Sequence, residues 1–133
     1  MTINSTDAEV LGTALSWLEE GQRVALVTVV ETWGSAPRPV GSLLAVCEDG
    51  RFSGSVSGGC IEEHLVARID RDFPERPYVT AYGVSADEAR SFGLPCGGNL
   101  RLVVDPIRDA SGVARVIAAR NAAKPLAADN SLC

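Results

Sequence analysis

Arg23–Val30 reads RVALVTVV, a run of β-branched and apolar side chains with almost no polar residue to face water. Such a strand suits a sheet covered on both faces, because a strand with one wet face alternates apolar and polar side chains. The run therefore predicts a strand near the centre of a sheet.

The segment before this strand predicts a helix over about residues 7–20. Thr6 and Glu9 have the spacing of a capping box, and Gly21 supplies a stop. Between them, apolar side chains recur at helical spacing: Ala8, Leu11, Leu15 and Leu18.

The segment after the strand predicts a hairpin. Ser42–Cys47 and Arg51–Val56 are β-prone runs that flank Glu48-Asp49-Gly50, and an Asp-Gly step between such runs is a strong turn signal. A helix is then predicted from Ile61 to about Pro74, because apolar residues fall on one face of it.

Two further strands are predicted at residues 78–82 and 99–104, the second closed by Pro106. Ser85–Glu88 has a second capping-box form, and Ser111 is a candidate cap for a last helix. The inner face of that last helix would carry Val113, Val116 and Ile117.

These elements predict an α/β fold: a single layered domain with a mixed β-sheet, one hairpin and flanking helices. The chain has 133 residues, of which 46% are hydrophobic, enough for one core. The domain is assigned to residues 1–124. Residues 125–133 have no periodicity and are expected to be a flexible tail.

Composition excludes several classes of function. With 12 basic and 17 acidic residues the net charge is -5, which argues against a nucleic-acid partner. No apolar run approaches the roughly 20 residues that cross a bilayer, and no basic segment precedes an apolar one at the start. We expect a soluble, cytoplasmic protein with reduced thiols and no membrane partner.

The strongest candidate site is the stretch GSVSGGCIE, residues 54–62, which joins a predicted strand to a helix. Such a junction presents unpaired backbone N–H groups and the positive end of the helix dipole, so it favours an anion. Ser55 and Ser57 add hydroxyl donors, while Gly58 and Gly59 let a phosphate or a pterin edge approach the backbone. The alternative is that the glycines make only a tight turn.

Cys60 stands at or near the first position of that helix, where a thiol has a lowered pKa and more thiolate character. It is therefore a candidate ligand for a soft metal, the alternative being a small buried hydrophobic residue. Glu62 is predicted to be partly buried with a shifted pKa, or to cap the helix through first-turn N–H groups. His64 has the spacing of a metal pair with Cys60, although a surface histidine is the favoured interpretation.

Two more loops carry a similar mixture of residues. Cys96-Gly97-Gly98 again joins a cysteine to two glycines, and Ser35 and Arg38 lie in a loop rich in glycine and proline. Arg38 is suited to a bidentate phosphate contact, the alternative being an ordinary solvated arginine. We predict that the three loops converge on one site, with Cys60 as a candidate metal ligand. Cys47, within the hairpin, is expected to be a packing residue.

Three ordered motifs resemble those of the XdhC/CoxI family, the accessory factors of xanthine dehydrogenase and carbon monoxide dehydrogenase. They are ETWGSAPR at residues 31–38, GSVSGGCIE at 54–62 and GLPCGG at 93–98. The resemblance is to the N-terminal domain of the family and covers roughly residues 8–105.

The resemblance implies a protein that binds molybdenum cofactor, the molybdopterin complex of molybdenum, and delivers it to a client molybdoenzyme. In the family the cysteine of the S-G-G-C loop is the leading candidate for cofactor contact, which corresponds to Cys60, and the C-G-G cysteine corresponds to Cys96. Larger members continue into a Rossmann-like second domain, to which the resemblance does not extend. Further candidate partners are therefore a cysteine desulfurase and a separate Rossmann-like subunit. A homodimer is compatible with the small size.

The preferred hypothesis is a cofactor-binding chaperone without turnover of its own. The first alternative is an enzyme in which Cys60 or Cys96 performs thiol-dependent sulfur transfer or redox chemistry during cofactor maturation. The second is a non-catalytic interaction domain whose glycine loops serve packing.

Overall fold

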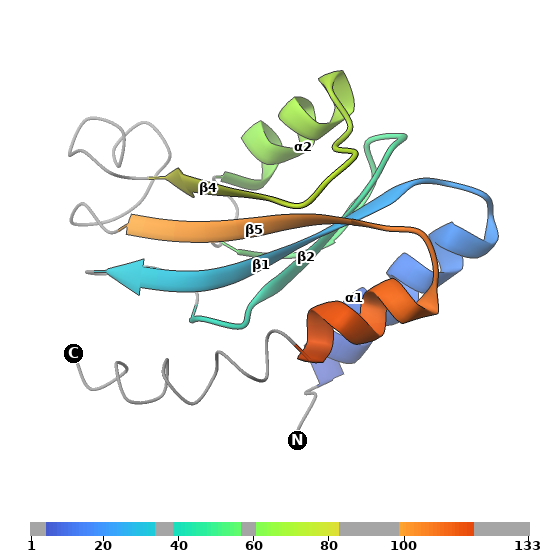
Figure 1. Cartoon of the computed structure of the whole chain (residues 1–133), viewed down its shortest axis with the longest axis horizontal. Helices are drawn as coiled ribbons and strands as arrows, with labels where there is room; N and C mark the ends of the chain where they lie inside the picture. Colours follow the sequence, from blue (N-terminus) through green and yellow to red (C-terminus); the bar gives the residue numbers. More distant parts are fainter. Residues whose placement is uncertain (1–4, 34–38, 57–60, 83–98, 119–133) are drawn as a thin grey trace.

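The structure is a computed structural model that describes residues 5–33, 39–56, 61–82 and 99–118 (Figure 1). The elements follow the chain in the order α1 (Ser5–Glu19), β1 (Val24–Trp33), β2 (Leu43–Cys47), β3 (Phe52–Gly54), α2 (Ile61–Arg71), β4 (Tyr78–Tyr82) and β5 (Asn99–Ile107), and a further helix covers residues 110–118. The second capping box at Ser85–Glu88 and the predicted tail at 125–133 lie outside the described residues.

The strands form one five-stranded sheet in the order β3-β2-β1-β5-β4. The RVALVTVV run is thus the central strand, as its composition predicts. The hairpin is also confirmed, with Gly50 at a φ of 96° in the turn between β2 and β3. This positive φ is the conformation that makes glycine the favoured residue there.

The α/β class, the single layered domain, the hairpin and the flanking helices are confirmed, and the one difference lies in strand direction. The sequence predicts a mixed sheet, whereas all pairings between the described strands are antiparallel. The helix α2 does connect two strands that run in the same direction, β3 and β4, but these are the two edges of the sheet. The crossover therefore creates no parallel neighbours among the described strands.

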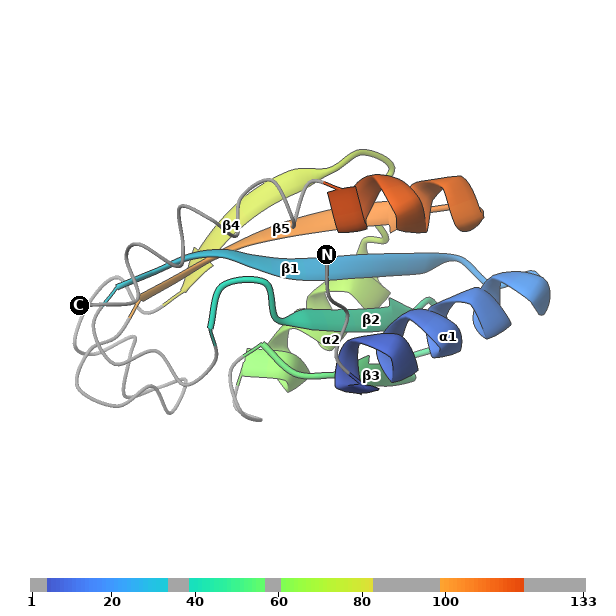
Figure 2. The same cartoon turned by 90° about the horizontal axis from the view of Figure 1, so that it is seen from below.

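Side chains alternate along β1 between two hydrophobic clusters, one on each face of the sheet. Ala25, Val27 and Val29 belong to the cluster that contains the buried face of α2. Val24 and Leu26 belong to the cluster beneath α1 and the helix at 110–118. Figure 2 shows α1 and α2 on opposite sides of the sheet. Both faces of the central strand are consequently dry.

The last helix begins close to its predicted cap but is capped by a different residue. Asp109 Oδ1 accepts hydrogen bonds from the backbone nitrogens of Ser111 at 3.0 Å and Gly112 at 3.2 Å, so Asp109 caps the helix. Ser111 Oγ donates to the same oxygen at 2.6 Å. Val113 and Val116 are buried on the inner face, as predicted.

Strand β5 continues beyond the predicted stop at Pro106, which pairs with Ala25 of β1. Pairing with β4 reaches only as far as Val104. A proline that lacks an N–H group is tolerated where one side of a strand has no partner to bond. None of the helices in the described part of the chain is long and apolar enough to cross a bilayer.

Candidate functional site

Strand ends that flank the three predicted loops lie at one end of the sheet. β1 ends at Trp33, which pairs with Asn99 at the start of β5, and β4 ends at Tyr82, which pairs with Leu100. These ends lie together at the left of Figure 1. The antiparallel order also brings the start of α2 to this side. The end of β1, the start of α2 and the two strand ends that flank residues 83–98 therefore lie at this end, whereas β2 begins opposite Thr28 and β3 ends level with Val27.

The first loop returns to the sheet beside β1. Ser42 accepts a hydrogen bond at its carbonyl from the Val29 nitrogen at 3.0 Å, and Gly41 donates to the Val29 carbonyl at 2.8 Å. Ser42 Oγ donates to the Pro39 carbonyl at 2.7 Å. The pairing of β1 with β5 shifts its register between Val29 and Glu31, at the same level. The chain after the first loop therefore rejoins the sheet at the point along β1 where the register with β5 shifts.

Gly54 is the last residue of β3 and directly precedes Ser55. Its φ is +100°, and a Cβ atom built on it would clash with the Leu43 carbonyl oxygen and lie 2.8 Å from Cγ2 of Val10. The next nitrogen, that of Ser55, donates to the Leu43 carbonyl at 3.1 Å. Only glycine lets the chain pass this close to β2 and α1 while turning toward residues 57–60.

Glu62 is buried at 2% exposure in the first turn of α2, which agrees with the first of its two predicted alternatives, burial of the carboxylate. Its Oε2 accepts hydrogen bonds from Ser55 Oγ and from the Val56 backbone nitrogen, both at 2.8 Å. We call this set the Glu62 bridge (Ser55, Val56 and Glu62). It connects the chain before residues 57–60 with the helix after them.

His64 is exposed, as the favoured interpretation predicts, and contacts the end of β4. Its Nδ1 lies 3.0 Å from the hydroxyl of Tyr82, and the two rings meet edge to face with centroids 5.5 Å apart. One turn further, Arg68 donates to Thr80 Oγ1 at 3.1 Å. A signal for these contacts is present in the sequence: His64 and Arg68 are four residues apart on α2, and their partners Tyr82 and Thr80 are two residues apart on β4.

Tyr82 itself is buried at 4% exposure. Burial raises the pKa of its phenol, and a hydrogen bond from Arg68 acts in the opposite direction. The hydroxyl therefore keeps its proton at neutral pH and is available as a hydrogen-bond donor.

The predicted cofactor-binding residues are described only in part. Ser55 and Glu62 lie within the structure and are brought together by the Glu62 bridge. The others lie outside the described residues and stay predictions: Ser35, Arg38, Ser57, Gly58, Gly59, Cys60, Cys96, Gly97 and Gly98. Within the described ranges, no group of three or more His, Cys, Asp or Glu side chains could hold a metal ion.

Cys47 packs in the core at 1% exposure, as predicted. Burial raises the pKa of its thiol, so the thiolate is disfavoured.

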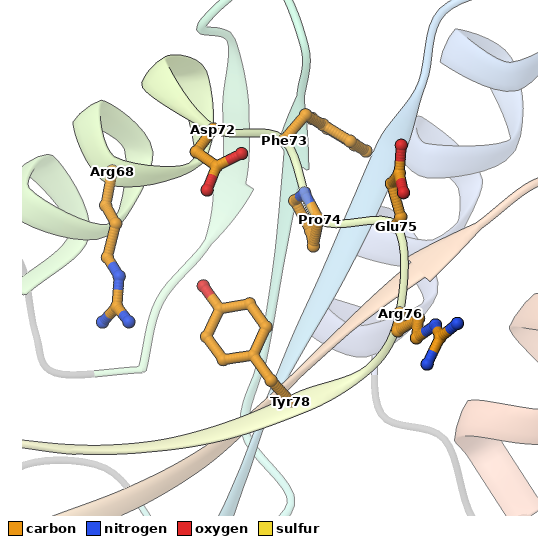
Figure 3. Close-up of a pocket in the computed structure, with 7 residues that line it drawn as sticks. All are labelled: Arg68, Asp72, Phe73, Pro74, Glu75, Arg76 and Tyr78. Atoms are coloured by element: carbon orange, nitrogen blue, oxygen red, sulfur yellow. The ribbon is translucent and has the colours of Figure 1, made fainter.

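A cavity of about 570 Å³ lies between the end of α2 and the start of β4, at the opposite end of the sheet from the loop anchors. Figure 3 shows the side chains of Asp72 and Tyr78 pointing toward each other across it. Two arginines and two carboxylates line the cavity, so their charges cancel. The cavity therefore has no net charge that would attract either anions or cations. Its lining residues are Arg68, Asp72, Phe73, Pro74, Glu75, Arg76 and Tyr78.

Comparison with known proteins gives one consistent result. Residues 17–72 match the model of the XdhC and CoxI family. The molybdenum cofactor insertion chaperone PaoD of Escherichia coli strain K12 is 34% identical over 118 residues, which cover 88% of this chain and 37% of that protein. A probable subunit of xanthine dehydrogenase from Bacillus subtilis strain 168 is 31% identical over 83 residues, 62% of this chain and 25% of that protein.

Among solved structures, a crystal structure of a xanthine dehydrogenase from Bacillus halodurans matches with a TM-score of 0.58 and 25% sequence identity, over 72% of this chain and 30% of that one. The chain thus spans little more than a third of the length of PaoD. The family match includes β1, the hairpin, the Glu62 bridge and α2. The protein therefore belongs to the XdhC and CoxI family.

Proposed function

We propose that this protein binds molybdenum cofactor and delivers it to a partner molybdenum hydroxylase of the xanthine or carbon monoxide dehydrogenase kind. The observation that carries the proposal is that at least one flanking end of each glycine-containing loop lies at the same end of the sheet: the end of β1, the start of α2, and both the end of β4 and the start of β5. The name of the E. coli relative, a molybdenum cofactor insertion chaperone, supports the choice of cargo.

The residues at this end of the sheet suit the chemistry of the cargo. The cofactor is an anion through its phosphate, and α2 begins at this end and directs its first-turn N–H groups there. Ser57, Gly58 and Gly59 precede the helix, and Arg38 would add a guanidinium for the phosphate.

Cys60 and Cys96 would contribute thiolates, which are ligands for a soft metal. The cytoplasm keeps such thiols reduced, and we place the handover there. Ser55 and Glu62 act in this proposal through the Glu62 bridge, because Glu62 Oε2 accepts hydrogen bonds from Ser55 and Val56. They hold the chain on both sides of Cys60 at a fixed spacing.

The test is anaerobic titration of the purified protein with molybdenum cofactor, with bound molybdenum and pterin measured separately. Wild type is expected to retain close to one equivalent of each, and Cys60→Ser or Cys96→Ser to lose it. Cys47→Ala is the matched control, since that thiol is buried in the core.

Absence of binding to wild type would overturn the proposal. Catalytic sulfur transfer that continues for many turnovers and depends on Cys60 would instead favour the sulfur-transfer enzyme. Unchanged binding by both cysteine variants would show that neither thiol contacts the cargo.

A further inference from the structure

The two edges of the sheet are protected to different degrees. The edge strand β3 has only three residues and ends at Gly54, where the backbone has a positive φ. The edge strand β4 has five residues, keeps a regular register with β5 and contains no charged residue or proline. Natural sheets usually guard an edge by short length, charge, proline or a bulge, and β4 has none of these. Among the described strands it pairs only with β5, so it forms an open rim of the sheet (Figure 2).

The side chains on one face of this rim are apolar and exposed. Val79 is 60% exposed, and Ala81, two residues further along the same face, is exposed as well. In the described part of the chain the other exposed large hydrophobic side chain is Phe52, on the opposite edge strand. An open strand edge beside exposed apolar side chains is a surface suited to the addition of another strand.

The sequence of β4 indicates which strand would fit. Tyr78–Tyr82 reads YVTAY, which has tyrosine at both ends and is nearly the same in reverse. Antiparallel pairing with a second copy, about a two-fold axis at Thr80, therefore places each terminal tyrosine opposite a tyrosine. The same axis places Val79 opposite Ala81, and Thr80 opposite itself. Aromatic pairs and threonine pairs across strands are favourable, and a two-fold interface requires self-complementarity of this kind.

The side chains that α2 places above β4 are complementary under the same axis. His64 lies at one end of the strand, with its Nδ1 3.0 Å from the Tyr82 hydroxyl. Asp72 lies at the other end, where it points toward Tyr78 (Figure 3). Because the axis sets Tyr78 of one copy beside Tyr82 of the other, it brings Asp72 of each copy to the side of His64 of the other copy. The charge pattern thus favours the antiparallel pairing.

Arg68, between these two residues on α2, is already engaged within its own subunit. It donates to Thr80 Oγ1 at 3.1 Å, which directs its guanidinium onto its own strand. The Asp72 carboxylate, by contrast, makes no hydrogen bond or ion pair with any described residue. The imidazole of His64 can donate to a carboxylate when its Nδ1 accepts from the Tyr82 hydroxyl. The contact across the axis therefore uses a carboxylate that the isolated subunit leaves unpaired in its described part.

We infer that β4 is the interface of a two-fold symmetric homodimer, in which antiparallel pairing of β4 with β4 joins the two sheets. The occupant of the open edge is a second copy of this chain. The inference does not depend on the proposed function, because it uses none of the predicted cofactor-binding residues. Since β4 ends at the loop end of the sheet, this pairing directs the loop ends of the two subunits to opposite ends of the joined sheet.

The first experiment is sedimentation equilibrium of wild type, Val79→Lys and Phe52→Lys over a range of protein concentrations. Wild type is expected to be a dimer at micromolar concentration. Val79→Lys places two like charges on the same face of the joined strands and is expected to weaken the dimer at least about tenfold. Phe52→Lys is the matched control, because it makes a similar change on the other edge strand, and it is expected to leave dimerisation unchanged. Thermal unfolding of each variant checks that it is folded.

Two further pairs of variants test the geometry. Asp72→Asn is expected to weaken the dimer about threefold, whereas Asp70→Asn, at an exposed position on the same helix, is expected to have no effect. Thr80→Cys places two thiols opposite each other at the axis, so mild oxidation is expected to give a disulfide-linked dimer that peptide mapping assigns to position 80. Phe52→Cys is expected to give no such product.

A wild type that stays monomeric at every concentration would overturn the inference. A dimer that Val79→Lys leaves intact, or that Phe52→Lys weakens equally, would overturn it too, because the interface would lie elsewhere. Should Val79→Lys fail to fold, the presence or absence of the disulfide at position 80 decides the question. None of these measurements contains cofactor, so failure of the carrier proposal would leave their outcome unchanged.

Discussion

The Oε2 atom of Glu62 lies 2.8 Å from the backbone nitrogen of Val56, six residues earlier in the chain. The interaction is buried, and a hydrogen bond to a buried carboxylate is among the stronger ones in proteins. It joins Val56, which precedes the S-G-G-C segment, to Glu62, which lies in the first turn of the helix that follows this segment.

Replacement of Glu62 by Gln is therefore expected to lower the free energy of unfolding by about 1–3 kcal/mol. The amide keeps the size of the side chain but cannot offer a charged oxygen to both Ser55 and Val56. Urea unfolding measures the change. Glu63→Gln is the control, because Glu63 is exposed and its change should stay within about 0.5 kcal/mol. Equal effects of the two substitutions would contradict the bridge.

Gly54 and Gly12 are expected to respond to alanine in opposite directions. At Gly54 the new Cβ meets the Leu43 carbonyl and the backbone has a positive φ, so Gly54→Ala should destabilise the fold by about 2–3 kcal/mol. Gly12 lies in α1 with no atom within 4 Å of the added Cβ, so Gly12→Ala should stabilise by about 0.5–1 kcal/mol. Denaturant midpoints of the two variants provide the comparison, and a stable Gly54→Ala protein would refute the close approach.

The cap of the last helix predicts a specific dependence on pH. Hydrogen bonds, first from the Ser111 side chain and then from the Gly112 backbone, lower the pKa of Asp109 below its ordinary value of 3.8. A lowered pKa means that the stabilisation is fully present above pH 3.8 and is lost as the pH falls through the depressed value. Thermal unfolding of wild type and Asp109→Asn between about pH 5 and about pH 2.5 should converge at the acid end, because the asparagine cap does not titrate. A constant difference across this range would count against the assignment of Asp109 as the cap.

Cys47 is expected to resist alkylation in the native protein. Its thiol is buried and burial raises its pKa, so the thiolate is scarce and the reagent has little access to it. Peptide mapping after iodoacetamide treatment should show labelling of Cys47 at least about tenfold slower than in urea-unfolded protein. Fast native labelling would place this thiol outside the core and remove Cys47→Ala as a valid control.

Local signals in the sequence were sufficient for most of the elements. The run at 23–30 gives the central strand because both of its faces are dry, and Asp49-Gly50 gives the hairpin because glycine accepts the positive φ of the turn. Strand direction was harder to predict. It depends on which strands become neighbours, and α2 joins strands at the two edges of the sheet.

The remaining differences come from contacts between distant residues. Pro106 does not end β5, because the pairing with β4 stops at Val104 and leaves one side of the strand without the need for an N–H donor. The candidate site was predicted from its glycines and cysteines, whereas the partnership of His64 with Tyr82 requires knowing that α2 crosses β4. That fact belongs to the topology and not to any local pattern.

The pairing of β1 with β5 also determines when the sheet can be completed during synthesis of the chain. β1 acquires β2 from the next segment of the chain, but its other neighbour is made only after α2 and β4 have been synthesised. Long-range pairing of this kind is slow and leaves an apolar strand edge unprotected in the meantime. The pairing that covers this edge of β1 is therefore the last one the sheet acquires, and until β5 has been synthesised the central strand has only β2 as a neighbour.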